Sequence, residues 1–114
     1  MVPPAAGAVV LVPFPFSDLS HAKLRPAVAL AHAGRGDWIL CQVTSNPYGD
    51  ARAVPLVEAG FASGSLRAES YARPGKLFTA RRDLMVAHVA SLRSETLGEI
   101  VEAIVGILRG GAAS

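Results

Sequence analysis

The sequence has little of what disulfide-rich and metal-binding proteins require. Its 114 residues include one cysteine and three histidines. The lone Cys41 cannot form an internal disulfide, and one cysteine with scattered histidines does not have the ligand spacing of a zinc site. We therefore expect a protein of the reducing cytoplasm whose chemistry needs no metal and no other cofactor.

Long apolar runs and export signals are also missing. No apolar run approaches the ~20 residues that a membrane-spanning helix requires. Residues 1–17 carry no charged side chain, but four prolines interrupt them and no basic segment precedes them, so we interpret them as containing a strand and not a signal peptide. We find no internal repeat, and we predict one soluble domain over residues 1–114.

Charge is sparse and apolar residues are plentiful. Charged residues make up 18% of the chain and hydrophobic residues 51%, which excludes a disordered protein. The net charge of +2 permits an anionic partner but falls far short of the basic surface of a duplex-DNA binder. The apolar excess also suggests surface shared with a second copy of the chain, so we expect a homo-oligomer.

Short valine-rich runs, broken by proline and glycine, dominate the pattern along the chain. Such runs predict strands, because β-branched residues favour strands and proline and glycine mark turns. Residues 61–70 contain glycine and serine and are predicted to be irregular, and residues 84–92 read as a strand with helix as the competing prediction. The predicted strands are 7–14, 27–31, 38–45 and 53–57, with two short extended pieces within 70–80.

The last element is predicted to be a helix. Its apolar residues follow the i, i+3, i+4, i+7 spacing of one helical face, with Ser94 as the N-cap and Arg109 and Gly110 at the end. We expect this stripe to pack on the core or on a partner. The order of elements predicts a mainly β (α+β) fold, a small antiparallel barrel or curled sheet with a C-terminal helix. The stripe consists of Leu97, Ile100, Val101, Ile104, Val105 and Leu108.

Arg25 occupies a notable position in the stretch HAKLRPAVAL, residues 21–30. Pro26 disfavours helix at Arg25 and fixes its own φ, so the chain leaves a polar loop in an extended conformation. Arg25 is then a cation on stiff backbone. It is either a solvated loop charge or a group placed to bind a phosphate.

Three segments together resemble a known family. The stretches GAVVLVPFPFSDLSHAKLRPAVAL, ILCQVTSN and SYARPGKLFTARRDL, in this order and spacing, are similar to the MazF/PemK toxins of toxin–antitoxin systems. The resemblance implies an SH3-like β-barrel with a C-terminal helix, a homodimer, metal-independent cleavage of single-stranded RNA and an antitoxin that covers the RNA groove. The family's catalytic arginine maps onto Arg25 and its catalytic threonine onto Thr44.

The residues suit that chemistry. RNA supplies its own nucleophile, the 2′-hydroxyl, which DNA lacks. The protein must stabilise charge on the phosphoryl oxygens, and a planar guanidinium matches those oxygens. The Thr44 hydroxyl can donate a second hydrogen bond from the end of a strand, so Arg25 and Thr44 would form a clamp.

The general base is not fixed by the sequence. Arginine stays protonated near neutrality, which leaves His21, Asp18 and Glu69 as candidates. In the PemK branch a strand arginine is followed two residues later by an aspartate, and these two residues have acid and base roles. Here the matching positions are Arg73 and Gly75, so the aspartate is missing.

Further residues are candidates for RNA contact, each with an ordinary alternative. Asn46 precedes a proline and is equally a turn former, and the basic residues are equally plain surface charges. Arg81 and Arg82 are expected to form a solvated corner. The RNA-binding candidates are Phe16, Ser17, His21, Lys23, Ser45, Asn46, Arg73 and Lys76.

Two other functions compete with the endoribonuclease. One is a binding toxin of the same fold, as in the related CcdB toxins that poison DNA gyrase. The other is a decayed toxin that keeps only antitoxin or RNA binding, which Gly75 suggests. Both Arg25 and Thr44 favour the nuclease, because a gyrase binder does not need a phosphate clamp.

Overall fold

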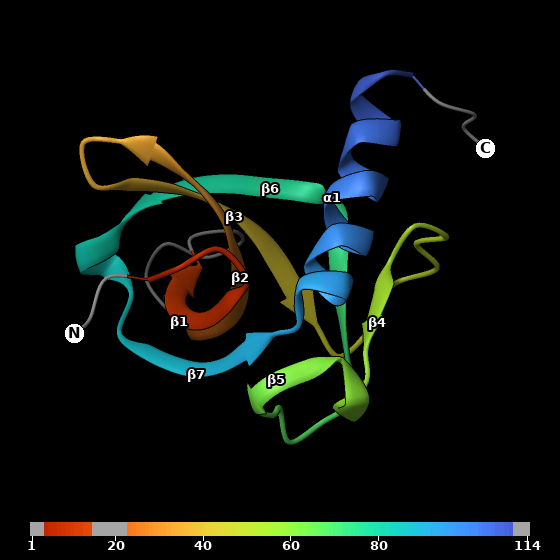
Figure 1. Ribbon diagram of the computed structural model, residues 1–114, viewed down its shortest axis with the longest axis horizontal. Coiled ribbons are helices and arrows are strands. Elements are labelled where there is room, and N and C mark those ends of the chain that lie inside the picture. Colours follow the sequence, from red (N-terminus) through yellow and green to blue (C-terminus); the bar gives the residue numbers. More distant parts are fainter. Residues whose placement is uncertain (1–3, 15–22, 111–114) are drawn as a thin grey trace.

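Seven strands and one helix form most of the chain in residues 4–14 and 23–110, which the computed structural model describes (Figure 1). The strands make one antiparallel sheet in the order β4-β6-β3-β2-β1-β7-β5. Two 3₁₀ turns, η1 (Glu58–Gly60) and η2 (Arg82–Leu84), connect elements. The remaining elements are β1 (Ala8–Phe14), β2 (Lys23–Gly34), β3 (Asp37–Thr44), β4 (Val54–Leu56), β5 (Phe61–Gly64), β6 (Ser70–Arg81), β7 (Ala87–Leu92) and α1 (Ser94–Leu108).

The sheet curls into a nearly closed barrel. Its two edge strands, β4 and β5, are consecutive in the chain and are joined only by Val57 and η1. Such a short connection requires the two edges of the sheet to approach each other, which curls the five strands between them. The predicted mainly β barrel with a C-terminal helix is therefore confirmed.

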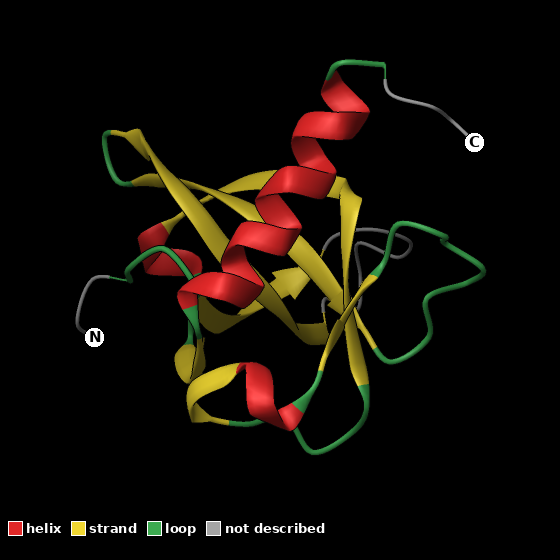
Figure 2. Cartoon of the chain, turned by 45° about the vertical axis from the view of Figure 1, so that its right-hand side comes forward, coloured by secondary structure: helices red, strands yellow, loops and turns green. Residues whose placement is uncertain are grey.

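The core lies on both faces of this curled sheet, because strand side chains alternate between faces. Helix α1 covers one face, where its fully buried Ile100 packs with strand residues such as Val28 and Cys41. Figure 2 shows α1 lying across the sheet. The opposite face of β1, β2 and β3 holds a second cluster, which includes Val10, Val12, Phe14, Ala27, Leu40 and Trp38.

Strand β2 is longer than predicted. It begins at Lys23 because β1 extends to meet it, with Phe14 opposite Lys23 and Val12 opposite Arg25. The ladder between β2 and β3 ends at the pair Ala27 and Gln42, so the start of β2 is bonded on one side only and tolerates Pro26. Arg25 therefore lies within a strand and not at its mouth.

In three other segments the observed secondary structure differs from the prediction or selects one of two predicted alternatives. Residues 61–64 form β5, because Phe61 pairs with Leu92 of β7. Residues 70–81 form one strand, in which the pairing with β3 shifts between Ala72 and Leu77. Residues 87–92 form a strand, so the competing helix prediction there is wrong.

Helix α1 buries only part of the predicted stripe. Ile100 and Ile104 face the sheet, whereas Leu108 is 75% exposed. The N-cap residue is Arg93 and makes no side-chain cap bond, so the prediction of Ser94 as N-cap is wrong; the Ser94 hydroxyl instead donates to Glu95 Oε1. Gly110 ends the helix with a φ of 66°, as expected of a C-terminal glycine. Neither α1 nor any other helix in the described ranges is long and apolar enough to cross a membrane.

Candidate functional site

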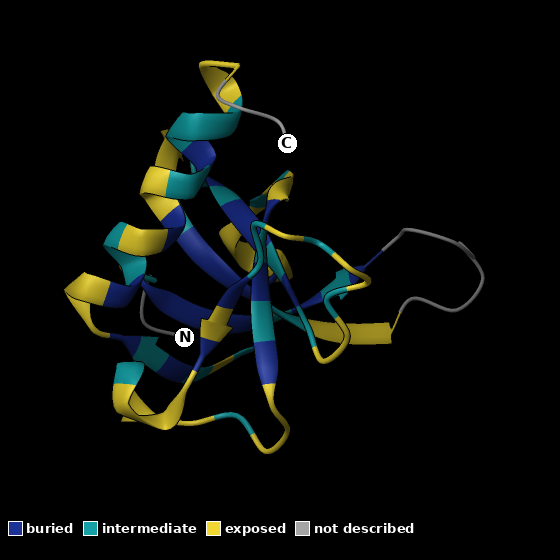
Figure 3. Ribbon diagram, turned by 90° about the vertical axis from the view of Figure 1, so that its right-hand side faces the viewer, coloured by how far each residue is buried: buried dark blue, intermediate teal, exposed yellow. Residues whose placement is uncertain are grey.

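Arg25 lies at the edge of the second core cluster, which contains Val12 and Ala27. It lies opposite Val12 of β1 and two residues before Ala27, so its side chain shares a face with these two buried residues. The Arg25 side chain is nevertheless exposed, because the partner strand β3 has ended its ladder at Ala27. Figure 3 shows the start of β2 as an exposed segment that projects beyond the buried core.

Thr44 stands at the same end of the same ladder. Gln42 of β3 is opposite Ala27, and Thr44 is two residues further along, on the same face as Gln42. The last pair of the ladder is Ala27 with Gln42. Arg25 lies two residues before Ala27 and Thr44 two residues after Gln42, so both side chains face the same side of the sheet. On its other side, Thr44 pairs with Tyr71 of β6. The two residues predicted to form the clamp therefore lie at the same end of the β2–β3 ladder.

The Thr44 hydroxyl has a local structural role that sequence reasoning missed. It donates a hydrogen bond to the Asn46 carbonyl oxygen at 3.0 Å and accepts one from the Asn46 N–H at 3.1 Å. The Asn46 side-chain oxygen in turn accepts from the Tyr48 N–H at 2.9 Å. These bonds start the turn after β3. The Thr44 proton must therefore rotate away from Asn46 before it can be donated to a phosphate.

Arg73 of β6 is held by a carboxylate from the loop after β3. Its Nε donates to Asp50 Oδ2 at 3.2 Å, and both side chains are only 18% exposed. The guanidinium carbon lies 5.5 Å from the centre of the Tyr48 ring, which adds a cation–π contact. The other Asp50 oxygen, Oδ1, accepts the Arg52 N–H at 2.9 Å. The loop is therefore fastened to β6 next to the strand end that carries Thr44.

Asp50 is ionised at neutral pH. Partial burial raises its pKa, but the Arg52 N–H and the hydrogen bond and charge of Arg73 outweigh burial, and the pKa lies below its ordinary value. Arg73 thus keeps Asp50 ionised, and the hydrogen bond between them orients both side chains. Neither acts as a free surface charge.

Position 75, where the PemK pattern has an aspartate, is directed elsewhere. A Cβ built on Gly75 would lie 3.9 Å from Ile107 Cδ1, so a side chain there would start beside α1. The carboxylate next to Arg73 comes instead from Asp50, 23 residues earlier. Asp50 and Tyr48 were not among the predicted site residues, because the turn NPYGD, residues 46–50, carries no sequence signal that it is fastened to β6.

The side chain of Cys41 is hydrogen-bonded to the backbone of Arg73. The fully buried Cys41 thiol donates to the Arg73 carbonyl oxygen at 3.2 Å, where the pairing of β6 with β3 is irregular. Burial, with a smaller contribution from the Asp50 charge, outweighs that hydrogen bond and raises the pKa of Cys41 to about 12. The thiol is therefore an inert core group.

The other predicted contacts are distributed unequally. Lys23 is exposed two residues before Arg25 on the same strand, and Ser45 is exposed next to Thr44. Lys76 is exposed next to Gly75, in the irregular part of β6. The predictions for Phe16, Ser17, Asp18 and His21 lie outside the described residues.

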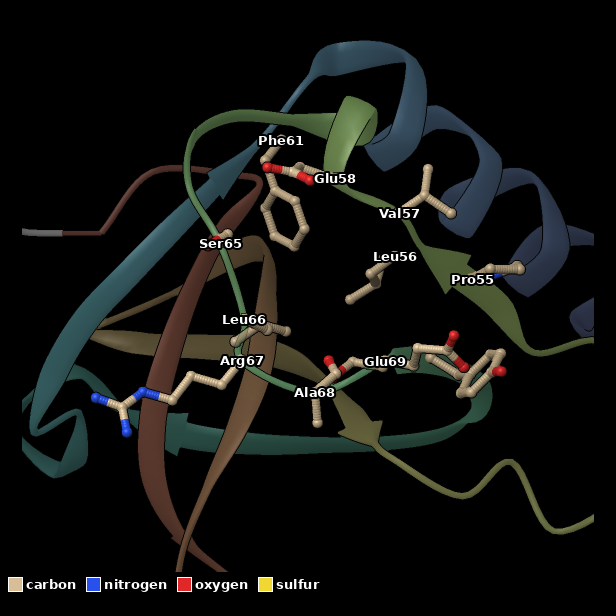
Figure 4. A pocket seen from close by; sticks show the side chains of 12 residues that line it. Pro55, Leu56, Val57, Glu58, Phe61, Ser65, Leu66, Arg67, Ala68 and Glu69 are labelled. Carbon is tan, nitrogen blue, oxygen red and sulfur yellow. The ribbon is translucent and has the colours of Figure 1, made fainter.

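Glu69 lies in a hollow that borders the row formed by Arg25, Thr44 and Tyr71. This hollow, of about 690 Å³, lies between β4, η1 and residues 65–71, and Tyr71 is part of its wall. Figure 4 shows Glu69 on one side of it and Leu56 and Phe61 further in. Within the described ranges, no three histidine, cysteine, aspartate or glutamate side chains are grouped so that they could hold a metal ion.

Several solved structures have a fold similar to that of this chain. The chain is similar to MazF in a MazE-MazF crystal structure from Deinococcus radiodurans, at 23% identity and a TM-score of 0.73, with 98% of this chain and all of that chain covered. It is also similar to the Mycobacterium tuberculosis toxin MazF-mt6, at 15% identity and 0.69, with 93% and 99% covered. An endoribonuclease in complex with its cognate antitoxin, from a mycobacterial species, matches at 16% identity and 0.67 over the full length of both chains.

These likenesses establish that the chain has the fold of the MazF toxins from end to end. At such low identities they concern the fold alone. The sequence itself matches no protein-family model and no curated protein closely enough to count.

Proposed function

We propose that the protein is the toxin of a MazF/PemK-type toxin–antitoxin pair and an endoribonuclease that cuts single-stranded RNA. The main observation behind the proposal is that Arg25 and Thr44 lie at the same end of the β2–β3 ladder and on the same face of the sheet. The fold, shared with solved MazF toxins over the whole chain, supports it. A guanidinium and a hydroxyl held on neighbouring strands are the donors that a phosphoryl group needs.

The reaction needs no nucleophile from the protein. The 2′-oxygen of the RNA attacks the neighbouring phosphorus, the bond from phosphorus to the 5′-oxygen breaks, and a 2′,3′-cyclic phosphate and a 5′-hydroxyl remain. Arg25 stabilises the charge that develops on the non-bridging oxygens, and Thr44 donates to one of them once its proton leaves the Asn46 carbonyl. The 2′-hydroxyl proton passes to a base, for which His21, Asp18 and Glu69 are the candidates, and the departing 5′-oxygen takes up a proton from solvent water or from the protonated base.

Arg73 supplies a second cation next to Thr44, and Asp50 is its positioning residue. Both Asp50 oxygens are occupied, one by Arg73 and one by the Arg52 N–H, so Asp50 is poorly suited to take a proton from RNA. Its role is to fix the direction of the Arg73 guanidinium. Arg73 then binds a phosphate of the RNA backbone with its remaining N–H groups.

The partners follow from the same proposal. A cognate antitoxin is supported by the solved complexes of similar chains with MazE and with a cognate antitoxin. A homodimer is supported by the exposed apolar side chains of α1, Leu108 and Val101. The protein would act in the cytoplasm, where mRNA is its substrate.

Incubating the purified protein with a mixed RNA pool in the presence of EDTA tests the proposal. We expect cuts at a short recurrent sequence, with 2′,3′-cyclic phosphate on the upstream fragment. The Arg25→Gln variant, purified in parallel, controls for contaminating nucleases and should leave the RNA intact. Intact RNA with the wild-type protein, together with inhibition of DNA gyrase, would replace this proposal by the binding toxin.

A further inference from the structure

A second hollow lies at the opposite end of β2 from Arg25. It has a volume of about 550 Å³ and forms where the turn between β2 and β3 meets the end of β6. The Arg82 N–H donates to the Gly36 carbonyl oxygen at 2.9 Å, which ties η2 to that turn. Figure 2 shows the hairpin and η2 on the same side of the molecule. The side chains that line this hairpin pocket are those of His32, Arg35, Trp38, Arg81, Arg82 and Asp83.

The charge of the hairpin pocket is positive. Three of the eleven basic residues of the chain line it, against one carboxylate, Asp83. That carboxylate lies 3.5 Å from Arg81, with both side chains about two-thirds exposed. Among the described residues, no carboxylate forms an ion pair with Arg35 or Arg82. The charge of the larger hollow beside Glu69 is the opposite, because two glutamates and one arginine line that hollow. The hairpin pocket therefore suits an anion.

Aromatic rings lie beside these guanidinium groups. Trp38 forms the buried side of the pocket, and the exposed His32 ring lies with its centre 5.4 Å from that of Trp38, at an angle of 59°. Guanidinium groups that bind phosphate, next to rings on which a base can stack, are the combination found in single-stranded nucleic acid sites. A free phosphate or an acidic peptide would make no use of the rings.

The hairpin pocket is separate from the proposed cleavage site. Arg25 and Arg35 are ten residues apart along β2 and its turn. At the usual strand rise of about 3.3 Å per residue, the chain between them is at most roughly 30 Å long, and Arg25 does not line the hairpin pocket. A phosphate bound at Arg35 and Arg82 therefore belongs to a different nucleotide from the one that contacts Arg25.

We propose that the hairpin pocket is an accessory site that binds a backbone phosphate of single-stranded RNA, outside the segment that is cut. Arg35 and Arg82 hold the phosphate, and the ring of His32 stacks with an adjoining base. The solvated corner expected for Arg81 and Arg82 is then part of this site. The proposal requires RNA to be a ligand of the protein but does not require the RNA to be cut.

Binding of an uncleavable RNA tests the proposal directly. Dissociation constants of fluorescent 2′-O-methyl RNAs of 3 and 20 nucleotides are measured over a range of salt for the wild type and for Arg35→Gln/Arg82→Gln. Because this variant lacks both guanidinium groups that hold the phosphate, the 20-mer should bind about tenfold more weakly, and the slope of log K against log salt should fall by about 0.7 for the one phosphate lost. The 3-mer is too short to reach both sites, so its affinity for the proposed cleavage site should stay within about twofold.

A matched control carries the same change of charge elsewhere. Arg93→Gln/Arg109→Gln removes two exposed arginines that line neither hollow, and it should keep the wild-type slope for the 20-mer. Equal slopes for both double variants would overturn the proposal. So would a pocket that binds polyglutamate or inorganic phosphate in an Arg35- and Arg82-dependent way while RNA binding is unchanged. Absence of any RNA cleavage would refute the proposed function but leave this test intact.

Discussion

Arg73 Nε lies 3.2 Å from Asp50 Oδ2, and this ion pair joins β6 to the loop that follows β3. The two residues are 23 positions apart, so the contact orders a loop that local turn chemistry alone would leave loosely placed. Thr44 begins the same loop, and the strand end that carries it pairs with β6 at Tyr71. The pair thus connects the second cation of the proposed site to its hydroxyl donor.

Loss of the Asp50 carboxylate should weaken RNA binding more than it slows chemistry. In Asp50→Asn, Arg73 keeps its charge but loses its fixed direction, so we expect KM to rise roughly tenfold while kcat changes less than threefold. Steady-state cleavage of a mapped RNA substrate gives both constants. The control is Glu102→Gln, an exposed change on α1 that should alter neither. If Asp50 were the general base, kcat would fall instead, and the positioning role would be wrong.

Stability at acid pH should depend on the same pair. The pKa of Asp50 is below its ordinary value in the folded protein, so its contribution is present above the unfolded pKa of about 3.9 and is lost as pH falls through the folded pKa. We expect the wild type to exceed Asp50→Asn by roughly 0.5–1 kcal/mol in unfolding free energy at pH 7. Urea unfolding between pH 7 and pH 3 should show this difference shrinking towards zero. A difference that stays constant with pH would contradict the ion pair.

Thr44 should have separable structural and catalytic roles. Thr44→Ser keeps the hydroxyl and both bonds to Asn46, so stability and cleavage should remain near wild type. Thr44→Val removes the hydroxyl and should lower the unfolding free energy by roughly 0.5–1.5 kcal/mol. It should also lower the cleavage rate on the order of a hundredfold, as for a lost oxyanion donor. A full rate with lowered stability would reduce Thr44 to a turn cap.

Two glycines with similar backbone angles should respond very differently to alanine. Gly64 and Gly49 have φ values of 67° and 71°, and a side chain at either position costs about 1 kcal/mol of conformational strain. At Gly64 a Cβ would also meet the Val89 carbonyl oxygen at 2.5 Å, whereas at Gly49 nothing lies within 4 Å. Thermal unfolding should therefore show Gly64→Ala to be the less stable variant by at least about 1 kcal/mol. Equal losses would mean that β5 and β7 shift apart without cost.

Local patterns in the sequence predicted most elements of this fold. The helix, the strands at 8–14 and 37–44 and the edge strand at 54–56 follow from valine-rich runs, turn residues and helical periodicity. The start of β2 could not be read in this way, because it forms by pairing with β1 across a polar, proline-containing segment. Strand β5 could not be predicted for the same reason: its glycine- and serine-containing segment becomes a strand only by pairing with β7.

The candidate site was predictable only in part. Arg25 and Thr44 carried a signal because Arg25 precedes one recognisable strand and Thr44 lies near the end of another, and the structure places both at one end of a ladder. Asp50 carried none, because its role depends on an ion pair with Arg73 that spans two elements. The hairpin pocket likewise combines Arg35 with Arg82, which are distant in the chain and meet only through the bond between η2 and the turn.

The single-turnover cleavage rate of Arg25→Ala tests the central claim most directly. The substrate is an RNA with one mapped cut site, and unfolding measurements accompany the kinetics because the Arg25 side chain is exposed and its loss should leave stability unchanged. Loss of the guanidinium from the phosphate clamp predicts a rate on the order of a hundredfold or more below that of the wild type. A folded Arg25→Ala protein that cuts this RNA at the wild-type rate would contradict the account.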